Sequence, residues 1–149
     1  MNAPELQHFL DNVFPDAPQP YVVEKAESWG VTLRLPVTVF HGRPGGTVSG
    51  PALMALADAA AFLAVLAQIG PVALAVTTSL HIDFLRKPAL VDVVAEGRLL
   101  KLGKSLAVID VGIRSVAGED LVAKAQVTYS IPPGAGSADA GNPSSPAES

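Results

Sequence analysis

The sequence predicts an α+β fold in which a curved antiparallel sheet wraps around one long central helix. Residues 50–69 form a single alanine-rich apolar segment of helical length. Residues 79–131 instead alternate apolar and polar side chains in successive runs, which is typical of antiparallel strands with one buried face. A helix that is apolar nearly all round must be covered by other structure. One helix and one sheet are therefore expected to bury each other in two layers.

The N-terminal part of the chain predicts a short helix and a pair of strands. Apolar residues recur at helical spacing through residues 2–12. The proline-rich residues 15–20 have the composition of a linker. Residues 21–26 and 31–39 have strand character and are separated by a short turn. Pro36 cannot donate to a sheet ladder, which favours an edge position or a bulge there.

The long apolar segment carries start and stop signals of a helix. It follows a glycine-rich loop at residues 41–46. Ser49 is a suitable N-cap and Pro51 suits the first turn, so the helix is expected to begin at Ser49 or Gly50. Gly70, which a proline follows, ends it.

Four strands are expected after this helix, at about residues 79–84, 91–102, 106–115 and 121–131. Residues 132–149 contain little apolar bulk, so they cannot offset the entropy of ordering and are expected to form a disordered tail. The predicted organisation has three parts, namely a helix with linker at 1–19, a folded domain at 20–131 and the tail at 132–149.

The composition excludes several classes of function. A chain of 149 residues with a net charge of −4 lacks the basic face that nucleic-acid binding usually requires. It has no cysteine, and its three histidines do not have the spacing of a metal motif. The apolar segment is nearly long enough to cross a membrane, but Asp58 lies near its middle and period-two strands follow it. The first ten residues lack the pattern of a signal peptide, so we expect a cytoplasmic protein that does not bind membranes.

Three motifs occur in order along the chain. Residues 49–58 read SGPALMALAD, residues 77–88 read TTSLHIDFLRKP, and residues 100–106 read LKLGKSL. Together with the order of elements, these motifs resemble those of the hotdog-fold thioesterases, in particular the phenylacetate-pathway (PaaI-like) acyl-CoA thioesterase family. The resemblance extends over about residues 20–131. It implies a hotdog fold and hydrolysis of an acyl- or aryl-CoA thioester, with no cofactor beyond the coenzyme A of the substrate.

The resemblance also assigns roles to individual positions. In that family a His-Gly-Gly triplet opens the central helix and a catalytic Asp follows nine residues after the His. Here the triplet is Ser49, Gly50 and Pro51, and the acid is Asp58. The family's water-positioning Asn falls at Arg43. Hotdog active sites form between two protomers, so the resemblance implies a homodimer, with two dimers pairing into a tetramer.

Residue chemistry supports the same two central positions. The Gly50 N–H at a helix N-terminus is an unpaired donor that would stabilise an oxyanion, and the missing side chain would let a carbonyl approach. Asp58 is an isolated acid on an apolar helix, which makes it a candidate general base or nucleophile. The alternatives are that Gly50 is only a turn residue and that Asp58 caps a neighbouring loop.

Other polar residues have weaker assignments. Thr77 or Thr78 would hold the nucleophilic water, although threonine is also simply favoured in strands. Ser49 is expected to cap the helix or contact substrate, since no partner for a nucleophilic serine is visible. His81 and Asp83 alternate on one strand face and are expected to be solvated or to lie in an interface. Basic residues near strand ends would meet coenzyme A phosphates, or serve only solubility: Arg86, Lys87, Lys101 and Lys104.

Two other functions remain open at this point. A non-catalytic acyl- or CoA-binding protein is compatible with the changes at Ser49 and Arg43. A hotdog hydratase or dehydratase is less favoured, because that reaction requires a histidine near the helix start, where this chain has Ser49. The apolar helix residues Leu53, Met54, Phe62 and Leu66 are expected to form core or to line an acyl pocket.

Overall fold

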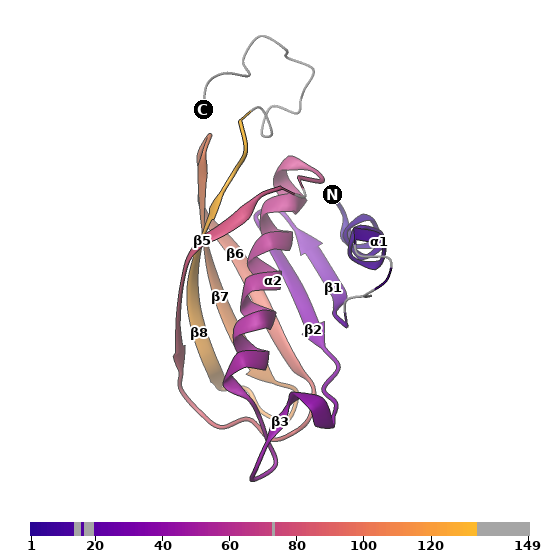
Figure 1. Ribbon diagram of the computed structural model, residues 1–149, viewed down its shortest axis with the longest axis vertical. Helices are drawn as coiled ribbons and strands as arrows, with labels where there is room; N and C mark the ends of the chain where they lie inside the picture. Colours follow the sequence, from indigo (N-terminus) through magenta and orange to yellow (C-terminus); the bar gives the residue numbers. More distant parts are fainter. Residues whose placement is uncertain (14–15, 17–19, 73, 134–149) are drawn as a thin grey trace.

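The computed structural model describes residues 1–13, 16, 20–72 and 74–133. The expected linker at 15–20 and the expected tail at 132–149 lie almost entirely outside these residues. Within them, helix α2 lies along the face of a curved antiparallel sheet, and the smaller helix α1 packs beside β1 (Figure 1). The predicted α+β architecture is confirmed. The elements in chain order are α1 (Ala3–Val13), β1 (Val22–Glu27), β2 (Gly30–Leu35), a 3-10 turn (Val39–His41), β3 (Gly42–Arg43), β4 (Thr47–Val48), α2 (Gly50–Ile69), β5 (Val76–Phe84), β6 (Val93–Leu102), β7 (Leu106–Ser115) and β8 (Leu121–Ser130).

The main sheet has the strand order β1-β2-β6-β7-β8-β5, with every neighbouring pair antiparallel. The strand that follows α2 in sequence is therefore at one edge of the sheet, paired only with β8 among the described strands. The core lies between α2 and the inward side chains of the strands, and nine α2 residues between Leu53 and Leu66 are buried. This arrangement leaves β5 as an open edge close to the middle of the molecule's longest helix.

Several predicted boundaries need correction. The strand expected at 31–39 ends at Leu35, because Pro36 stops its ladder. The expectation that Pro36 marks an edge or a bulge is wrong, since β2 lies between β1 and β6 and has ended before the proline. The loop expected at 41–46 contains part of a small hairpin formed by β3 and β4. The strand expected at 79–84 begins three residues earlier, at Val76.

Helix α2 approaches the sheet closely at one glycine. A Cβ added to Gly97 of β6 would lie 3.1 Å from the main-chain oxygen of Ala60, which is closer than ordinary packing allows. Glycine at this position lets the helix backbone rest directly on the strand. Because Ala60 is two residues beyond Asp58, this contact helps to set the height of the acid above the sheet.

Asp92 fixes the segment that leads from β2 to the start of α2. Its Oδ1 accepts from the Val37 N–H at 2.9 Å, and its Oδ2 accepts from Arg34 Nε at 2.8 Å. These two donors, the backbone N–H first, hold the pKa of Asp92 below its usual value. The chain after Pro36 is thereby tied to the loop before β6.

Helix α2 is long and apolar enough to cross a membrane by length and composition alone. Half of this span is buried inside the protein.

Candidate active site

Asp58 and Thr77 meet in the structure, as expected for two residues of one site. The Thr77 hydroxyl donates to Asp58 Oδ1 at 2.6 Å, joining α2 to the start of β5. Asp58 is half-buried and Thr77 is exposed. The acid therefore lies at the border of the apolar layer and is partly exposed.

A β-bulge turns Thr77 toward the helix. Thr77 pairs with Tyr129 and Ser79 pairs with Thr128, so Thr78 is an extra residue without a partner position on β8. Beyond the bulge, Leu80 and the alternate residues after it face inward. Without the extra residue, Thr77 would fall on the outward face. The Thr78 hydroxyl instead donates to the main-chain oxygen of Thr128 at 3.2 Å, so Thr78 does not join Asp58.

Tyr129 is the member of this cluster that sequence reasoning missed. Its hydroxyl lies 2.9 Å from Asp58 Oδ1 and 3.2 Å from the Asp58 main-chain oxygen. The side chain is only 4% exposed. Strand alternation places this tyrosine on the inward face, but no sequence signal connects it with an acid 71 residues away.

Aromatic rings surround the tyrosine. The ring of Phe62 stacks on Tyr129 with centroids 5.8 Å apart, and Phe9 of α1 packs on Phe62 at 6.1 Å. Burial and the Asp58 charge raise the pKa of Tyr129, although the neighbouring Thr77 hydroxyl acts in the opposite direction. Burial, followed by the charge of Asp58, also raises the pKa of Tyr21. Both phenols therefore remain protonated near neutral pH.

The N-terminus of α2 is capped as expected. Ser49 has an extended backbone, and its side chain accepts from the Ala52 N–H at 3.3 Å. The Ser49 hydroxyl is thus engaged in the cap. The Gly50 N–H makes no hydrogen bond to another described residue.

The space beside Gly50, which was expected to be open to a substrate carbonyl, is occupied by the ring of Phe84. A Cβ at Gly50 would lie 3.4 Å from the ring of Phe84, so this protein's own aromatic side chain, and not a free opening, covers the glycine. Phe84 is at the end of β5 and is 50% exposed. The helix N-terminus therefore contacts the edge strand directly.

A pocket of about 540 Å³ opens beside Gly50. Three cationic side chains contribute to its wall, from β3 and from the segment after β5: Arg43, Arg86 and Lys87. The rest of the wall comes from β4, the start of α2, Phe84 and the neighbouring residues Leu85 and Pro88. Arg86 also bonds the main-chain oxygen of Leu121 at 2.6 Å, which fixes its position.

The two remaining predicted lysines lie elsewhere. Lys101 is in register with Val108 on β7, on the outward side of the sheet, and Lys104 is in the turn between β6 and β7. Neither lines the pocket beside Gly50. Asp58 also lies apart from that pocket, since eight residues of helix separate it from Gly50 by about 12 Å.

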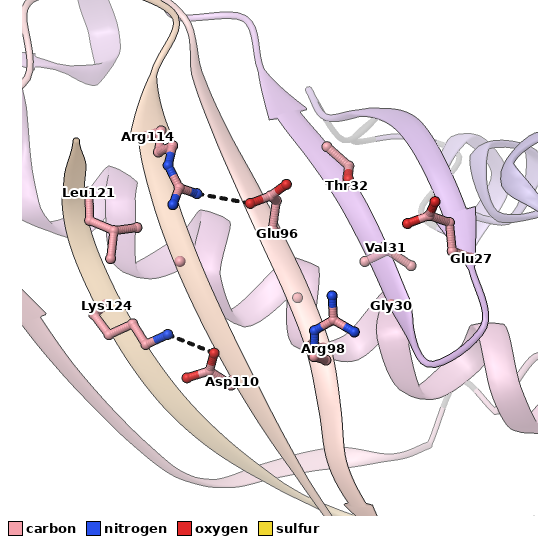
Figure 2. A pocket seen from close by; sticks show the side chains of 12 residues that line it. Glu27, Gly30, Val31, Thr32, Glu96, Arg98, Asp110, Arg114, Leu121 and Lys124 are labelled. Carbon is pink, nitrogen blue, oxygen red and sulfur yellow. Dashed lines mark hydrogen bonds and ion pairs between the residues drawn. The ribbon is translucent and has the colours of Figure 1, made fainter. Parts of the chain in front are cut away.

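The outward face of the sheet carries a different surface. A small hollow of about 180 Å³ lies there. Two ion pairs cross it, Arg114 to Glu96 at 2.9 Å and Lys124 to Asp110 at 2.7 Å (Figure 2). His81 and Asp83 are also exposed on this face and lie 3.2 Å apart. These two ion pairs and the His81–Asp83 contact lie on the opposite side of the sheet from Asp58. Among the described residues no group of three acidic or histidine side chains is placed to hold a metal ion.

A curved antiparallel sheet around one long helix is the arrangement of a hotdog fold (Figure 1). The chain belongs to the Thioesterase superfamily, whose family model matches residues 45–122. The expected hotdog fold and family resemblance are therefore confirmed.

Solved structures agree with this assignment. The chain is similar to a candidate thioesterase from Silicibacter sp. TM1040, with 44% identity, a TM-score of 0.82, and 89% of this chain and 93% of that one covered. It is also similar to a mutant of the phenylacetic acid degradation protein PaaI from Thermus thermophilus, with 28% identity, a TM-score of 0.65, and coverage of 74% and 92%. Zebrafish thioesterase superfamily member 2 shares the fold at 20% identity and a TM-score of 0.76, with coverage of 88% and 99%. None of the curated proteins matches the chain.

Proposed function

We propose that this protein is a PaaI-like thioesterase that hydrolyses an acyl- or aryl-CoA thioester, with Asp58 as general base or nucleophile. One observation carries the proposal. Asp58 Oδ1 accepts from Thr77 and lies within hydrogen-bond distance of Tyr129, and Oδ2 has no hydrogen bond to any described residue. A half-buried carboxylate with one oxygen fixed and one oxygen spare is suited to act on water or on a thioester carbonyl.

The general-base reaction balances with these groups. Asp58 removes a proton from water as the water oxygen attacks the thioester carbon, and the carbonyl oxygen becomes an oxyanion. Collapse of this intermediate breaks the carbon–sulfur bond, and the proton held by Asp58 passes to the departing thiolate. The products are a carboxylic acid and the free thiol. As nucleophile, Asp58 would instead form an anhydride that water then cleaves.

The oxyanion donor is proposed to come from a partner protomer. Asp58 and the Gly50 N–H are about 12 Å apart along one helix, too far to act on one carbonyl. β5 is an open edge, with Thr77 near its beginning and Phe84, which touches Gly50, at its end. If the β5 edges of two protomers pair antiparallel about a twofold axis, the Gly50 of each protomer lies near Thr77 and Asp58 of the other.

Exposed apolar side chains support this pairing. Val76 and Phe84 on β5 and Met54 on α2 are 56%, 50% and 42% exposed. An uncovered strand edge with apolar neighbours is a surface that proteins normally bury. We therefore propose a homodimer through β5, and two dimers forming a tetramer.

The cationic pocket beside Gly50 is the proposed site of the coenzyme A moiety. Arg43, Arg86 and Lys87 would pair with its phosphates, and guanidinium groups suit this role because they bind phosphate in a bidentate manner. No cofactor beyond the substrate's own coenzyme A is needed. Nucleic-acid and membrane partners are not proposed, and a cytoplasmic location remains a prediction.

The decisive experiment is hydrolysis of a panel of aliphatic and aromatic acyl-CoA thioesters by wild type, Asp58→Asn and a matched control, Asp11→Asn. Asp11 is an exposed acid on α1, away from β5. We expect Asp58→Asn to lower kcat by about a hundredfold or more, with the melting temperature maintained and the control unaffected.

Two results would overturn the proposal. Near-wild-type turnover by a folded Asp58→Asn protein would show that the acid is structural. Tight acyl-CoA binding by a wild-type protein that hydrolyses no member of the panel would favour the non-catalytic binding function, for which the replacements at Ser49 and Arg43 are the motivating observation.

A further inference from the structure

We propose that Tyr129 is a positioning residue for Asp58, whose hydroxyl fixes the carboxylate so that Oδ2 faces the substrate. This inference rests on the proposed function of Asp58. It adds a residue that the family resemblance did not point to and that lies on a distant strand, β8.

The contacts define the role. The Tyr129 hydroxyl approaches two oxygens of the same residue, Oδ1 at 2.9 Å and the main-chain oxygen at 3.2 Å. The shorter distance and the negative charge favour donation to the carboxylate. Together with the Thr77 donor at 2.6 Å, the hydroxyl places two O–H groups on one carboxylate oxygen. Rotation of the Asp58 side chain would break both hydrogen bonds, so Oδ2 is held on the opposite side.

The tyrosine is itself held rigidly. Its ring stacks on Phe62, which is four residues after Asp58 on the same face of α2. Phe9 of α1 packs against Phe62. The hydroxyl is therefore held against the same part of the helix that carries the acid.

The protonation state suits a donor. Burial and the Asp58 charge raise the pKa of Tyr129, so the phenol keeps its proton over the range in which a carboxylate base is ionised. A deprotonated phenolate would instead repel the acid. Tyr129 is a donor to the acid and makes no proposed contact with substrate.

The test compares Tyr129→Phe with Tyr21→Phe. Both remove only a hydroxyl from a tyrosine near Asp58, but Tyr21 has no hydrogen bond from its hydroxyl to Asp58. We expect Tyr129→Phe to lower kcat about ten- to hundredfold with KM nearly unchanged, as for the loss of a hydrogen bond to a charged group. Tyr21→Phe should leave both kcat and KM unchanged.

A double variant separates positioning from general destabilisation. If Tyr129 acts only through Asp58, adding Tyr129→Phe to Asp58→Asn should cause little further loss of kcat. An additive loss, or a folded Tyr129→Phe protein with wild-type kcat, would overturn this inference and leave the proposed function standing. Wild-type turnover by Asp58→Asn would instead overturn both, and the single-variant panel therefore distinguishes the two failures.

Discussion

A single backbone N–H is the smallest part on which the proposed chemistry depends. Gly50 is the first residue of α2, and its N–H has no partner among the described residues. The preceding Ser49 has φ −74° and ψ 155°, which is the conformation that a residue before proline prefers. Proline also suits the first position of a helix. Residue 50 itself precedes Pro51, so thermal melting has to show that the helix start is kept when the donor is removed.

The prediction is that Gly50→Pro lowers kcat for thioester hydrolysis by about a hundredfold, the usual cost of one oxyanion donor. Gly50→Ala is the matched variant, because it keeps the N–H and places its Cβ 3.4 Å from the Phe84 ring, an ordinary contact distance. It should lose far less activity. Steady-state kinetics and thermal melting of both variants measure this, and equal losses would assign the effect to steric change.

At the scale of elements, the site is set by how α2 rests on the sheet. Gly97 lets the helix backbone approach β6, and the bulge at Thr78 delivers a hydroxyl from β5. These two features act on opposite sides of Asp58. The hydrogen bond between Thr77 and Asp58 requires both that α2 packs close to β6 and that the bulge turns Thr77 to the inward face of β5.

We predict that Gly97→Ala destabilises the protein by about 1–3 kcal/mol, because the added methyl lies 3.1 Å from a main-chain oxygen that cannot easily move. Gly118→Ala is the control, since a Cβ there meets nothing within 4 Å. Chemical denaturation of the two variants measures the difference. Equal stability of both would mean that α2 has room to shift on β6.

Much of this element scale is predictable from sequence. The apolar run with Ser49 before it and Gly70 after it defines α2 almost to the residue, because capping and breaking signals are local. The alternation along residues 106–115 defines β7 for the same reason. The bulge at Thr78 and the approach at Gly97 could not be predicted, because each depends on a partner strand or helix that is distant in sequence.

The site shows the same division. Asp58 can be recognised in the sequence as a lone acid in an apolar segment, and the family resemblance pointed to Thr77. Tyr129 could not be predicted as a site residue, because only the folded sheet brings it close to α2. Lys101 and Lys104 were grouped with Arg86 by charge alone, although they lie away from the pocket that Arg86 lines.

At the scale of the whole molecule, the proposed dimer makes a prediction that one protomer cannot satisfy. Asp58→Asn and Gly50→Pro homodimers should each be nearly inactive. When the two proteins are unfolded and refolded together, half of the random dimers are mixed, and each mixed dimer has one intact site. Activity should recover to about a quarter of the wild-type value.

Light scattering on the same samples provides the control, because a strictly monomeric protein at micromolar concentration cannot form such a site. Mixed samples that stay as inactive as either parent, while forming dimers, would place Asp58 and the Gly50 donor in different reactions.

The extra residue in β5 determines which face of the sheet each side chain before it points to. Upstream of Thr78 the strand is out of phase with its downstream half, so the hydroxyl that meets the acid and the apolar residues that face the helix share one side only because of that insertion. Deleting a single residue there would restore the phase and turn the hydroxyl to solvent, with every other amino acid retained. In this fold, chemistry can therefore be lost or acquired by a change in length alone, which a comparison of residue types between relatives would overlook.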